Sequence, residues 1–535
     1  MMPSSVVVAV LQTLMLGAAA PAEPIDIGSR LELMVDDYLI ASTRGPLRLQ
    51  LHQPVRREIV FKTDAPWEGN ASGYQSVFQD GKLYRMYYRG LHYRHSGPPA
   101  QALPDHPWNL CYAESDDGLR WRRPKLGICE FNDSKDNNII LTREMLTEIG
   151  GDPAHSAVLL DANPACPADA KYKVIVLGKG GLYALKSGDG VRFTPMSKEP
   201  IITEGAFDSQ NLVFWDPLRA EYREYHRGFK GGVRDIMTAV SKDILRFPKP
   251  QWLDHSGAGA EHLYTNQIQP YYRAPHIFLG FPMRYNDRGW SEPTFDLPGL
   301  DERLTRAKSH PRYGTAVTDA LLISSRDGLK FHRWAEAFLR PGPRERHSWV
   351  YGDNFVFWGM FETKSSVEDS PNEISLYATE SYWEGVYTSV RRYTLRIDGF
   401  VSAYAPLVGG EFVTKPIRFD GGNLALNVET SGAGGIQVEL QDLAGKPIEG
   451  YALADCPSIF CDRLQKIVRW KDRGGDVRSL AGKPVRLRFV LKDADLYSFQ
   501  FLPYQPDPPT PQVLQPTSTP RKPAATLPKS PAKRS

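Results

Sequence analysis

Acidic side chains precede four runs of strand-forming residues and are of a type that can do acid–base chemistry. Asp208 comes just before residues 211–215, and Asp152 comes just before residues 155–160. Two carboxyl groups held close together can divide one reaction, because one donates a proton while the other acts as nucleophile or base. The candidate catalytic residues are Asp208, Asp152, Glu261 and Glu68.

Each of these acids also has an ordinary structural interpretation. Asp208 could cap the turn before its strand, and Asp152 stands in a Gly-Gly-Asp-Pro sequence that is typical of a turn. Glu261 and Glu68 could be solvated loop residues. The sequence leaves both interpretations open at all of these positions.

Arginine follows the second strand of three predicted hairpins, at positions 89, 227 and 284. Guanidinium groups that converge can hold a carboxylate or a sulfate through paired hydrogen bonds, although ion pairing with neighbouring acids is an equal alternative. The candidate binding residues are Arg89, Arg227, Arg284, Gln210, Asn211, Tyr264 and His155.

A short recurring phrase predicts the elements that position these residues. Residues 115–121, 187–193 and 325–331 each read Ser-x-Asp-Gly and end on an aromatic residue, and residues 241–247 form a copy without the glycine. Asp and Gly tolerate the positive φ of a tight hairpin, so each phrase predicts a strand, a turn and a second strand. The four copies start 72, 54 and 84 residues apart, which suits the blades of a β-propeller.

Five hairpins rich in Tyr, Phe and Val accompany these phrases and predict an all-β fold. We expect a five-bladed β-propeller over residues 23–398, in which residues 31–61 add a strand that closes the ring. Alternating apolar and polar positions then predict an antiparallel β-sandwich over residues 399–502. Because one strand of an antiparallel hairpin starts where the next one ends, the acids and arginines should meet at one mouth of the propeller.

The two ends of the chain have compositions of their own. Residues 1–22 read as a signal peptide cut after Ala22, with an uncleaved membrane anchor as the alternative. We therefore expect an exported protein in the periplasm, at the cell surface or secreted, and no membrane span after cleavage. Residues 503–535 are rich in proline and predict a disordered tail.

Composition argues against several partners and cofactors. The net charge is +3 and residues 503–535 alone carry +4, so the body lacks the basic excess typical of nucleic-acid binding. Zinc, nucleotide and redox motifs are missing from the sequence, so we expect no cofactor of those kinds. Of the five cysteines, Cys456 and Cys461 are close enough in sequence to pair. The oligomeric state stays open.

Five blades, Asp-Gly phrases followed by an aromatic residue, export and a trailing sandwich together resemble the bacterial furanosidase-like glycoside hydrolases, families 32 and 43 and their relatives. Residues 35–40, 207–211 and 273–276 resemble more closely an exported bacterial group that is labelled family-32-like. The resemblance covers about residues 30–500. It implies that carboxylates at the propeller mouth hydrolyse the glycosidic bonds of a poly- or oligosaccharide, which would be anionic if the arginines bind it.

The resemblance also allows a calcium ion at the propeller axis. One departure stands out, because the related hydrolases carry an Asp-Pro acid ahead of the first inner strand. Residues 69–74 contain no acid here, and Glu68 is the nearest one. A non-catalytic carbohydrate-binding propeller is therefore the rival interpretation, and a structural module at the cell surface is the third.

Overall fold

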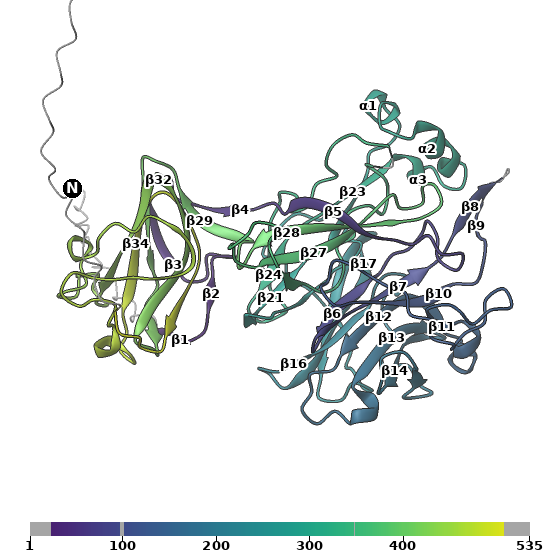
Figure 1. The fold of residues 1–535 in the computed structure, drawn as a ribbon, viewed down its shortest axis with the longest axis horizontal. Helices are drawn as coiled ribbons and strands as arrows, with labels where there is room; N and C mark the ends of the chain where they lie inside the picture. The colour runs from purple at the N-terminus through teal and green to yellow at the C-terminus, as the bar shows by residue number, and fades with distance from the viewer. Residues whose placement is uncertain (1–22, 97–100, 347, 508–535) are drawn as a thin grey trace, which may run out of the picture.

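The computed structural model describes residues 23–96, 101–346 and 348–507, which form two parts (Figure 1). Within these ranges, five four-stranded antiparallel sheets built from residues 55–396 form the larger part. This arrangement confirms the predicted all-β, five-bladed propeller. The predicted signal peptide and residues 508–535 of the predicted tail lie outside the described residues.

The first three blades follow one another along the chain, and their first strands pack together around the axis. Blade 1 contains β6 (Ser76–Asp80), β7 (Leu83–Gly90), β10 (Asn109–Ser115) and β11 (Ile139–Thr142). Blade 2 contains β12 (Asp152–Leu160), β13 (Tyr172–Gly178), β14 (Gly181–Ser187) and β15 (Thr194–Pro195). Blade 3 contains β16 (Leu212–Asp216), β17 (Glu221–Lys230), β18 (Val233–Ser241) and β19 (Gln251–Trp252).

The last two blades complete the ring. Blade 4 contains β20 (Gln269–Tyr271), β21 (Ala274–Gly280), β24 (Ile323–Ser325) and β25 (Phe331–Arg333). Blade 5 contains β26 (Phe361–Thr363), β27 (Glu373–Glu380), β28 (Ser389–Arg396) and β5 (Val55–Lys62). Because β5 comes from ahead of blade 1 and pairs antiparallel with β28, a strand from the start of the propeller closes the last blade, as predicted.

The N-terminal boundary of the propeller was wrong in the sequence analysis. Residues 25–51 pair with the C-terminal part instead, because their apolar side chains, such as Ile27, Met34 and Leu39, enter its core. These long-range pairs leave no local pattern in the sequence. They join β1 (Ile25–Gly28) to β31 (Ile417–Phe419), β2 (Glu32–Leu33) to β34 (Arg486–Leu502), β3 (Ile40–Arg44) to β30 (Gly410–Thr414), and β4 (Arg48–Leu51) to β29 (Val401–Ala405).

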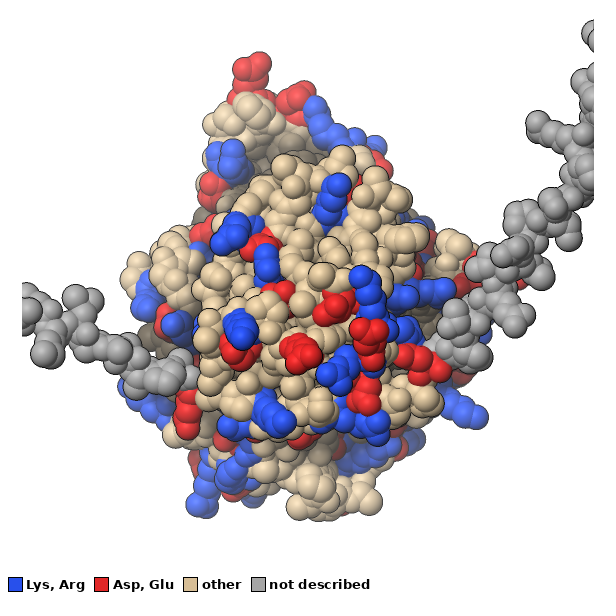
Figure 2. Space-filling view, turned by 90° about the vertical axis from the view of Figure 1, so that its left-hand side faces the viewer, with Lys and Arg blue, Asp and Glu red and all other residues tan. Residues whose placement is uncertain are grey.

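The C-terminal part is organised around one long antiparallel pair. Strand β32 (Asn423–Gln441) runs along β34, and together with β33 (Asp462–Ile467) they belong to a sheet of eight strands within the described ranges. The core includes the fully buried Trp470. Figure 2 views the molecule from this side and shows acidic and basic side chains interspersed over its described surface.

The five cysteines all lie in described residues and all are free, so the pairing of Cys456 with Cys461 does not form. Cys456 is buried in the core instead, where its sulfur accepts a hydrogen bond from the Val438 N–H at 3.4 Å.

Buried charges join the two parts. Asp398, at the end of blade 5, accepts hydrogen bonds from Tyr271 of blade 4 at 2.6 Å and from Ser498 of β34 at 3.0 Å. Arg326 donates to Glu32 at 2.8 Å and to Asp36 at 3.0 Å. Burial alone would raise the pKa of Glu32, but hydrogen bonding to His276 and the charge of Arg326 lower it to about 2. Residues 35–40 and 273–276 therefore contribute to the contacts between the propeller and the C-terminal part.

The loops between strands carry the remaining elements. Helices α1 (Glu292–Phe295), α2 (Leu300–Ala307) and α3 (Arg312–Thr315) lie between β22 (Met283–Asp287) and β23 (Ala316–Ala320). A separate hairpin consists of β8 (Tyr93–Ser96) and β9 (Gln101–Pro104). The 3₁₀ helices of the described residues are η1 (Glu144–Ile149), η2 (Ala168–Ala170), η3 (Leu453–Asp455) and η4 (Arg478–Leu480). In the described ranges, every helix is too short or too polar to cross a bilayer.

The recurring Ser-x-Asp-Gly phrase forms turns that connect neighbouring blades. In blade 2 the Gly190 N–H donates to Ser187 Oγ at 2.9 Å, and Gly190 has a φ of 82°. The Tyr87 hydroxyl of blade 1 donates to the Gly190 carbonyl at 3.0 Å. The same contact joins Tyr225 of blade 3 to the Gly328 carbonyl of blade 4 at 2.7 Å, and Tyr377 of blade 5 to the Gly118 carbonyl of blade 1.

We expect Tyr87→Phe to lower the free energy of unfolding by about 1 kcal/mol, because it removes this inter-blade bond and leaves the buried Gly190 carbonyl without it. Urea unfolding of both proteins measures the loss. Tyr404→Phe is the matched control, since its ring packs against Arg48 and its hydroxyl makes no hydrogen bond in the described residues. Equal midpoints for Tyr87→Phe and wild type would contradict the prediction.

Acid should weaken the same turns. Burial raises the pKa of Asp189, but hydrogen bonds from the Arg192 and Val191 N–H groups and from Ser187 outweigh it and lower the pKa to about 2. A depressed folded-state pKa stabilises the protein fully above the unfolded value near 4, and that contribution disappears as the pH falls toward about 2. Between these pH values we expect the unfolding midpoint of wild type to fall more steeply than that of Asp189→Asn. Parallel slopes would refute this assignment.

Candidate functional site

Aromatic side chains from the loops that lead into the inner strands fill the centre of the propeller mouth. Tyr74 precedes β6, Tyr264 precedes β20 and Phe355 precedes β26. Both tyrosine rings stack on Phe355, each with a centroid separation of 5.8 Å. Tyr74 has a φ of 56°, a backbone conformation that is costly for a large side chain and is often found at functional sites.

Two of the three predicted arginines join this aromatic centre. The Arg89 guanidinium lies 4.8 Å from the Tyr74 ring and donates to the Tyr382 hydroxyl at 2.7 Å. The Arg227 guanidinium lies 4.9 Å from the Tyr264 ring. Burial would lower the pKa of Arg227, but Tyr264 and Asp208 outweigh it and raise that pKa, so the group stays charged.

Two of the four predicted acids also reach the centre. Arg227 donates to Asp208, whose side chain remains 68% exposed. Asp152 accepts the Ala154 N–H at 2.7 Å and pairs with His155 at 3.2 Å. The His155 ring in turn lies 5.3 Å from that of Tyr74. These contacts define one mouth cluster, which consists of Tyr74, Arg89, Asp152, His155, Asp208, Arg227 and Tyr264.

Gln210 and Asn211 were predicted to bind substrate, but they lie beneath the mouth and are almost fully buried. Gln210 donates to the Tyr74 carbonyl at 3.0 Å and accepts from Gln267 at 2.8 Å. Asn211 donates to the Phe207 carbonyl at 3.0 Å. The Gln210 amide holds the lead-in loops of blades 1, 3 and 4 together across the axis, and Asn211 fixes its own loop, so both position the cluster without facing a ligand.

Glu68 is incorrectly predicted as a catalytic residue, because its side chain is completely buried. Arg123 donates to both of its carboxylate oxygens at 2.8 Å, and the Ala65 N–H donates at 3.0 Å. Tyr88 donates a further hydrogen bond. This closed set of donors makes Glu68 a structural anchor of the loop ahead of blade 1.

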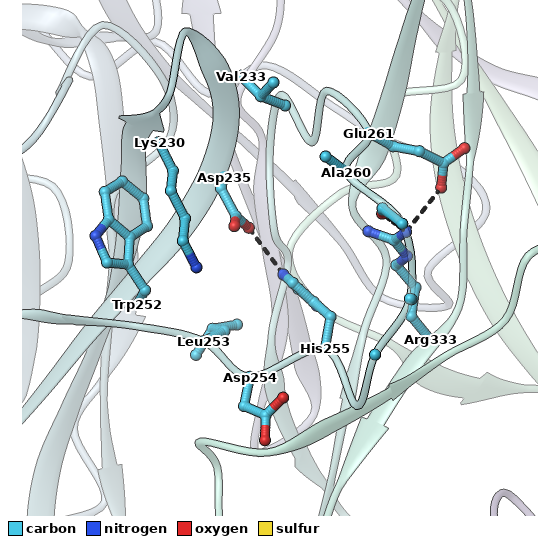
Figure 3. A pocket seen from close by; sticks show the side chains of 13 residues that line it. Lys230, Val233, Asp235, Trp252, Leu253, Asp254, His255, Ala260, Glu261 and Arg333 are labelled. Carbon is cyan, nitrogen blue, oxygen red and sulfur yellow. Dashed lines mark hydrogen bonds and ion pairs between the residues drawn. The ribbon is translucent and has the colours of Figure 1, made fainter.

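Glu261 and Arg284 lie away from the mouth cluster, at the side of blades 3 and 4. Arg284 pairs with Asp319 at 2.8 Å and with Glu261 at 3.0 Å, so the ion-pair alternative describes it. Glu261 also pairs with Arg333 at 3.2 Å (Figure 3). Glu261 is therefore engaged by two arginines outside the mouth cluster.

Glu261 and Arg333 line a cavity of about 510 Å³ (Figure 3). On another side of this cavity, His255 pairs with Asp235 at 2.8 Å, a pair that the sequence analysis missed. Trp252 and Lys230 also line the space. Nothing in the spacing of residues 235 and 255 signals this pair, because a long loop separates them.

The sequence analysis also missed Tyr351, Tyr382 and Arg234, which surround the mouth cluster. The Tyr351 hydroxyl donates to that of Tyr264 at 2.8 Å, and the Arg234 guanidinium lies 5.4 Å from the Tyr264 ring. Arg234 begins the third strand of blade 3, at the same sheet edge as the lead-in loops. The expectation that strand starts and strand ends meet at one sheet edge (the edge rule), if applied to third strands as well, would have found Arg234.

The resemblance allows a calcium ion at the axis, but the described residues there are not a suitable set of donors. The side-chain amides of Gln210 and Gln267 meet there beside the Gln75 backbone carbonyl, whereas calcium sites usually combine six to eight oxygen ligands that include carboxylates. In the described part of the chain, no three His, Cys, Asp or Glu side chains form a metal-binding group. These residues do not fit calcium, and no step below depends on it.

Comparison with known proteins gives distant likenesses only. No family model matches the chain, and no curated protein does. A glycoside hydrolase family 43 arabinoxylan arabinofuranohydrolase from Bacillus subtilis has a TM-score of 0.37 and 12% identity, over 84% of this chain and 99% of its own. An endo-1,4-β-xylanase from Bacteroides thetaiotaomicron has a TM-score of 0.39 and 11% identity, over 63% and 96%.

An N-acetylgalactosamine deacetylase from F. plautii has a TM-score of 0.38 and 9% identity, over 65% of this chain and 96% of its own. Similarity at this level carries no argument about the reaction of this chain. Any function has to be argued from the mouth cluster.

Replacing Glu68 should damage stability. We expect Glu68→Gln to lower the free energy of unfolding by about 3 kcal/mol, because Arg123 would lose its buried carboxylate partner. Thermal unfolding measures the change, and Glu449→Gln, an exposed position in the C-terminal part, is the control. A Glu68→Gln protein as stable as wild type would show that the ion pair is not an anchor.

Proposed function

We propose that this chain is a glycoside hydrolase that cleaves a poly- or oligosaccharide at the mouth cluster. The observation that carries the proposal is the continuous set of contacts from Asp152 through His155, Tyr74 and Phe355 to Tyr264, Arg227 and Asp208. It brings carboxylates of two different blades to one aromatic cluster, in which Tyr74 and Phe355 are buried and Tyr264 is partly exposed. Aromatic faces stack on sugar rings, and paired carboxylates perform glycoside hydrolysis.

Asp208 is the proposed base or nucleophile. Its carboxylate is exposed to a ligand and pairs with the neighbouring Arg227. In the simplest course, Asp208 takes a proton from a water molecule as the water oxygen attacks the anomeric carbon. Asp152 is the second carboxylate, which the Ala154 N–H and His155 hold in a fixed orientation.

The arginines support an anionic substrate. Arg89 donates to a carbonyl and a phenol, and no carboxylate pairs with it in the described residues. Buried Nε and Nη1 atoms of Arg227 lack hydrogen-bond partners there as well. Uncompensated buried charge is costly, so an excess of guanidinium groups favours a sulfated or uronic acid-containing glycan. The composition of residues 1–22 supports export, which we propose together with this function.

A carbohydrate-binding propeller without catalysis is the second candidate. It is favoured by one observation, that Glu68 and Glu261, the other two candidate acids, are both engaged by arginine. Such a protein would keep the aromatic and cationic surface and have no proton donor among these acids.

One experiment separates the two candidates. Sulfated, uronic and neutral glycans are incubated with the protein, and new reducing ends are measured beside calorimetric binding. We expect hydrolysis of an anionic glycan, with a loss of at least about 100-fold for Asp208→Asn and a smaller loss for Asp152→Asn. Asp472→Asn, exposed in the C-terminal part, should retain full activity. Binding without cleavage would favour the second candidate.

A further inference from the structure

The proposed reaction also needs a proton donor for the leaving oxygen. Glu68 is sealed under Arg123, and Glu261 is held between Arg284 and Arg333. Asp208 pairs with Arg227 and is the proposed base or nucleophile, and Asp152 is already engaged by the Ala154 N–H and by His155. A group that donates a proton must therefore be sought among the other side chains of the mouth cluster.

Tyr264 has the surroundings that stabilise a phenolate. Two guanidinium groups lie near its ring, that of Arg227 at 4.9 Å and that of Arg234 at 5.4 Å. The Tyr264 oxygen accepts a hydrogen bond from the Tyr351 hydroxyl at 2.8 Å. Because Tyr351 donates, the proton of Tyr264 is directed to another acceptor. The residue as a whole remains partly exposed.

The neighbouring phenols lack this combination of contacts. Burial raises the pKa of Tyr74 and of Tyr351 well above the usual value. Burial also acts to raise the pKa of Tyr264, but the charge of Arg227 and the hydrogen bond from Tyr351 outweigh it and lower that pKa. The titratable groups that face Tyr264 from the surrounding elements are Tyr74, Tyr93, Asp208, Arg227, Arg234, Tyr285, Tyr351 and Tyr382.

The backbone ties Tyr264 to the proposed base. The Ser209 hydroxyl, directly after Asp208, donates to the Tyr264 carbonyl at 2.8 Å. The Tyr264 N–H donates to the Met283 carbonyl at 2.8 Å. These bonds fix the lead-in loops of blades 3 and 4 against each other, as a reaction with two cooperating groups requires.

We propose that Tyr264 is the catalytic proton donor of this site, an inference that rests on the proposed function. As the bond between the anomeric carbon and the leaving oxygen breaks, its electron pair stays on that oxygen, which takes the Tyr264 proton. Water supplies the new bond to the anomeric carbon and gives one proton to Asp208. That proton then returns to the Tyr264 phenolate through solvent, so one water is consumed and both groups are restored.

The test combines two measurements on wild type and Tyr264→Phe. Ultraviolet absorbance of tyrosinate against pH should show one ionisation below the usual tyrosine range in wild type and none in Tyr264→Phe. Tyr404→Phe, in the C-terminal part, should keep that step. With the glycan identified by the hydrolysis screen, Tyr264→Phe should lower kcat about 100-fold with little change in KM and remove the alkaline limb of the pH–rate profile.

Arg234→Gln covers the case in which Tyr264→Phe misfolds. It keeps the phenol and removes one cation, so the tyrosinate step and the alkaline limb should both move up by about one pH unit. Unchanged kcat and alkaline limb in Tyr264→Phe, or an unmoved limb in Arg234→Gln, would overturn the proton-donor role alone. A wild-type protein that cleaves none of the glycans would overturn the proposed function and the donor role with it, whatever the tyrosinate titration shows.

Discussion

Closure of the propeller ring is the constraint on which the mouth cluster depends. Its members come from positions 74 to 264 and belong to blades 1 to 4, so local structure alone cannot bring them together. The antiparallel pairing of β5 with β28 ties the start of the propeller to its last blade. Bonds across the axis, such as that from Gln210 to the Tyr74 carbonyl, then fix the lead-in loops in one register.

The C-terminal part secures the same closure from outside. The chain passes through β1 to β4 in that part before it enters β5, so both flanks of the closing blade are anchored in one core. Asp398 adds a buried polar connection, because it accepts hydrogen bonds from Tyr271 of blade 4 and from Ser498 of β34. Breaking a buried group of this kind is costly, so the two parts are held in a defined arrangement.

The balance of positive and negative side chains at the mouth differs from the one that the candidate acids in the sequence suggested. Arginine engages Glu68, Glu261 and Asp208, whereas Arg89 has only neutral acceptors in the described residues. A surface of this kind favours anions, and it stabilises a phenolate more readily than a protonated carboxylic acid. The aromatic residues consequently take part in the electrostatics of the site, since the Arg89 and Arg227 guanidinium groups lie against the Tyr74 and Tyr264 rings.

The sequence by itself determined the repeated elements. Ser-x-Asp-Gly turns are local chemistry, since the glycine accepts a positive φ and the Ser and Asp side chains bond to nearby N–H groups, so five blades and a lead-in edge could be predicted. The edge rule also identified Asp152, Asp208, Arg89 and Arg227. Only the tertiary structure decided that β1 to β4 leave the propeller, that Arg123 covers Glu68 and that the Tyr351 hydroxyl reaches Tyr264. These outcomes depend on which distant side chains share a low-dielectric interior, and spacing along the chain carries no record of that.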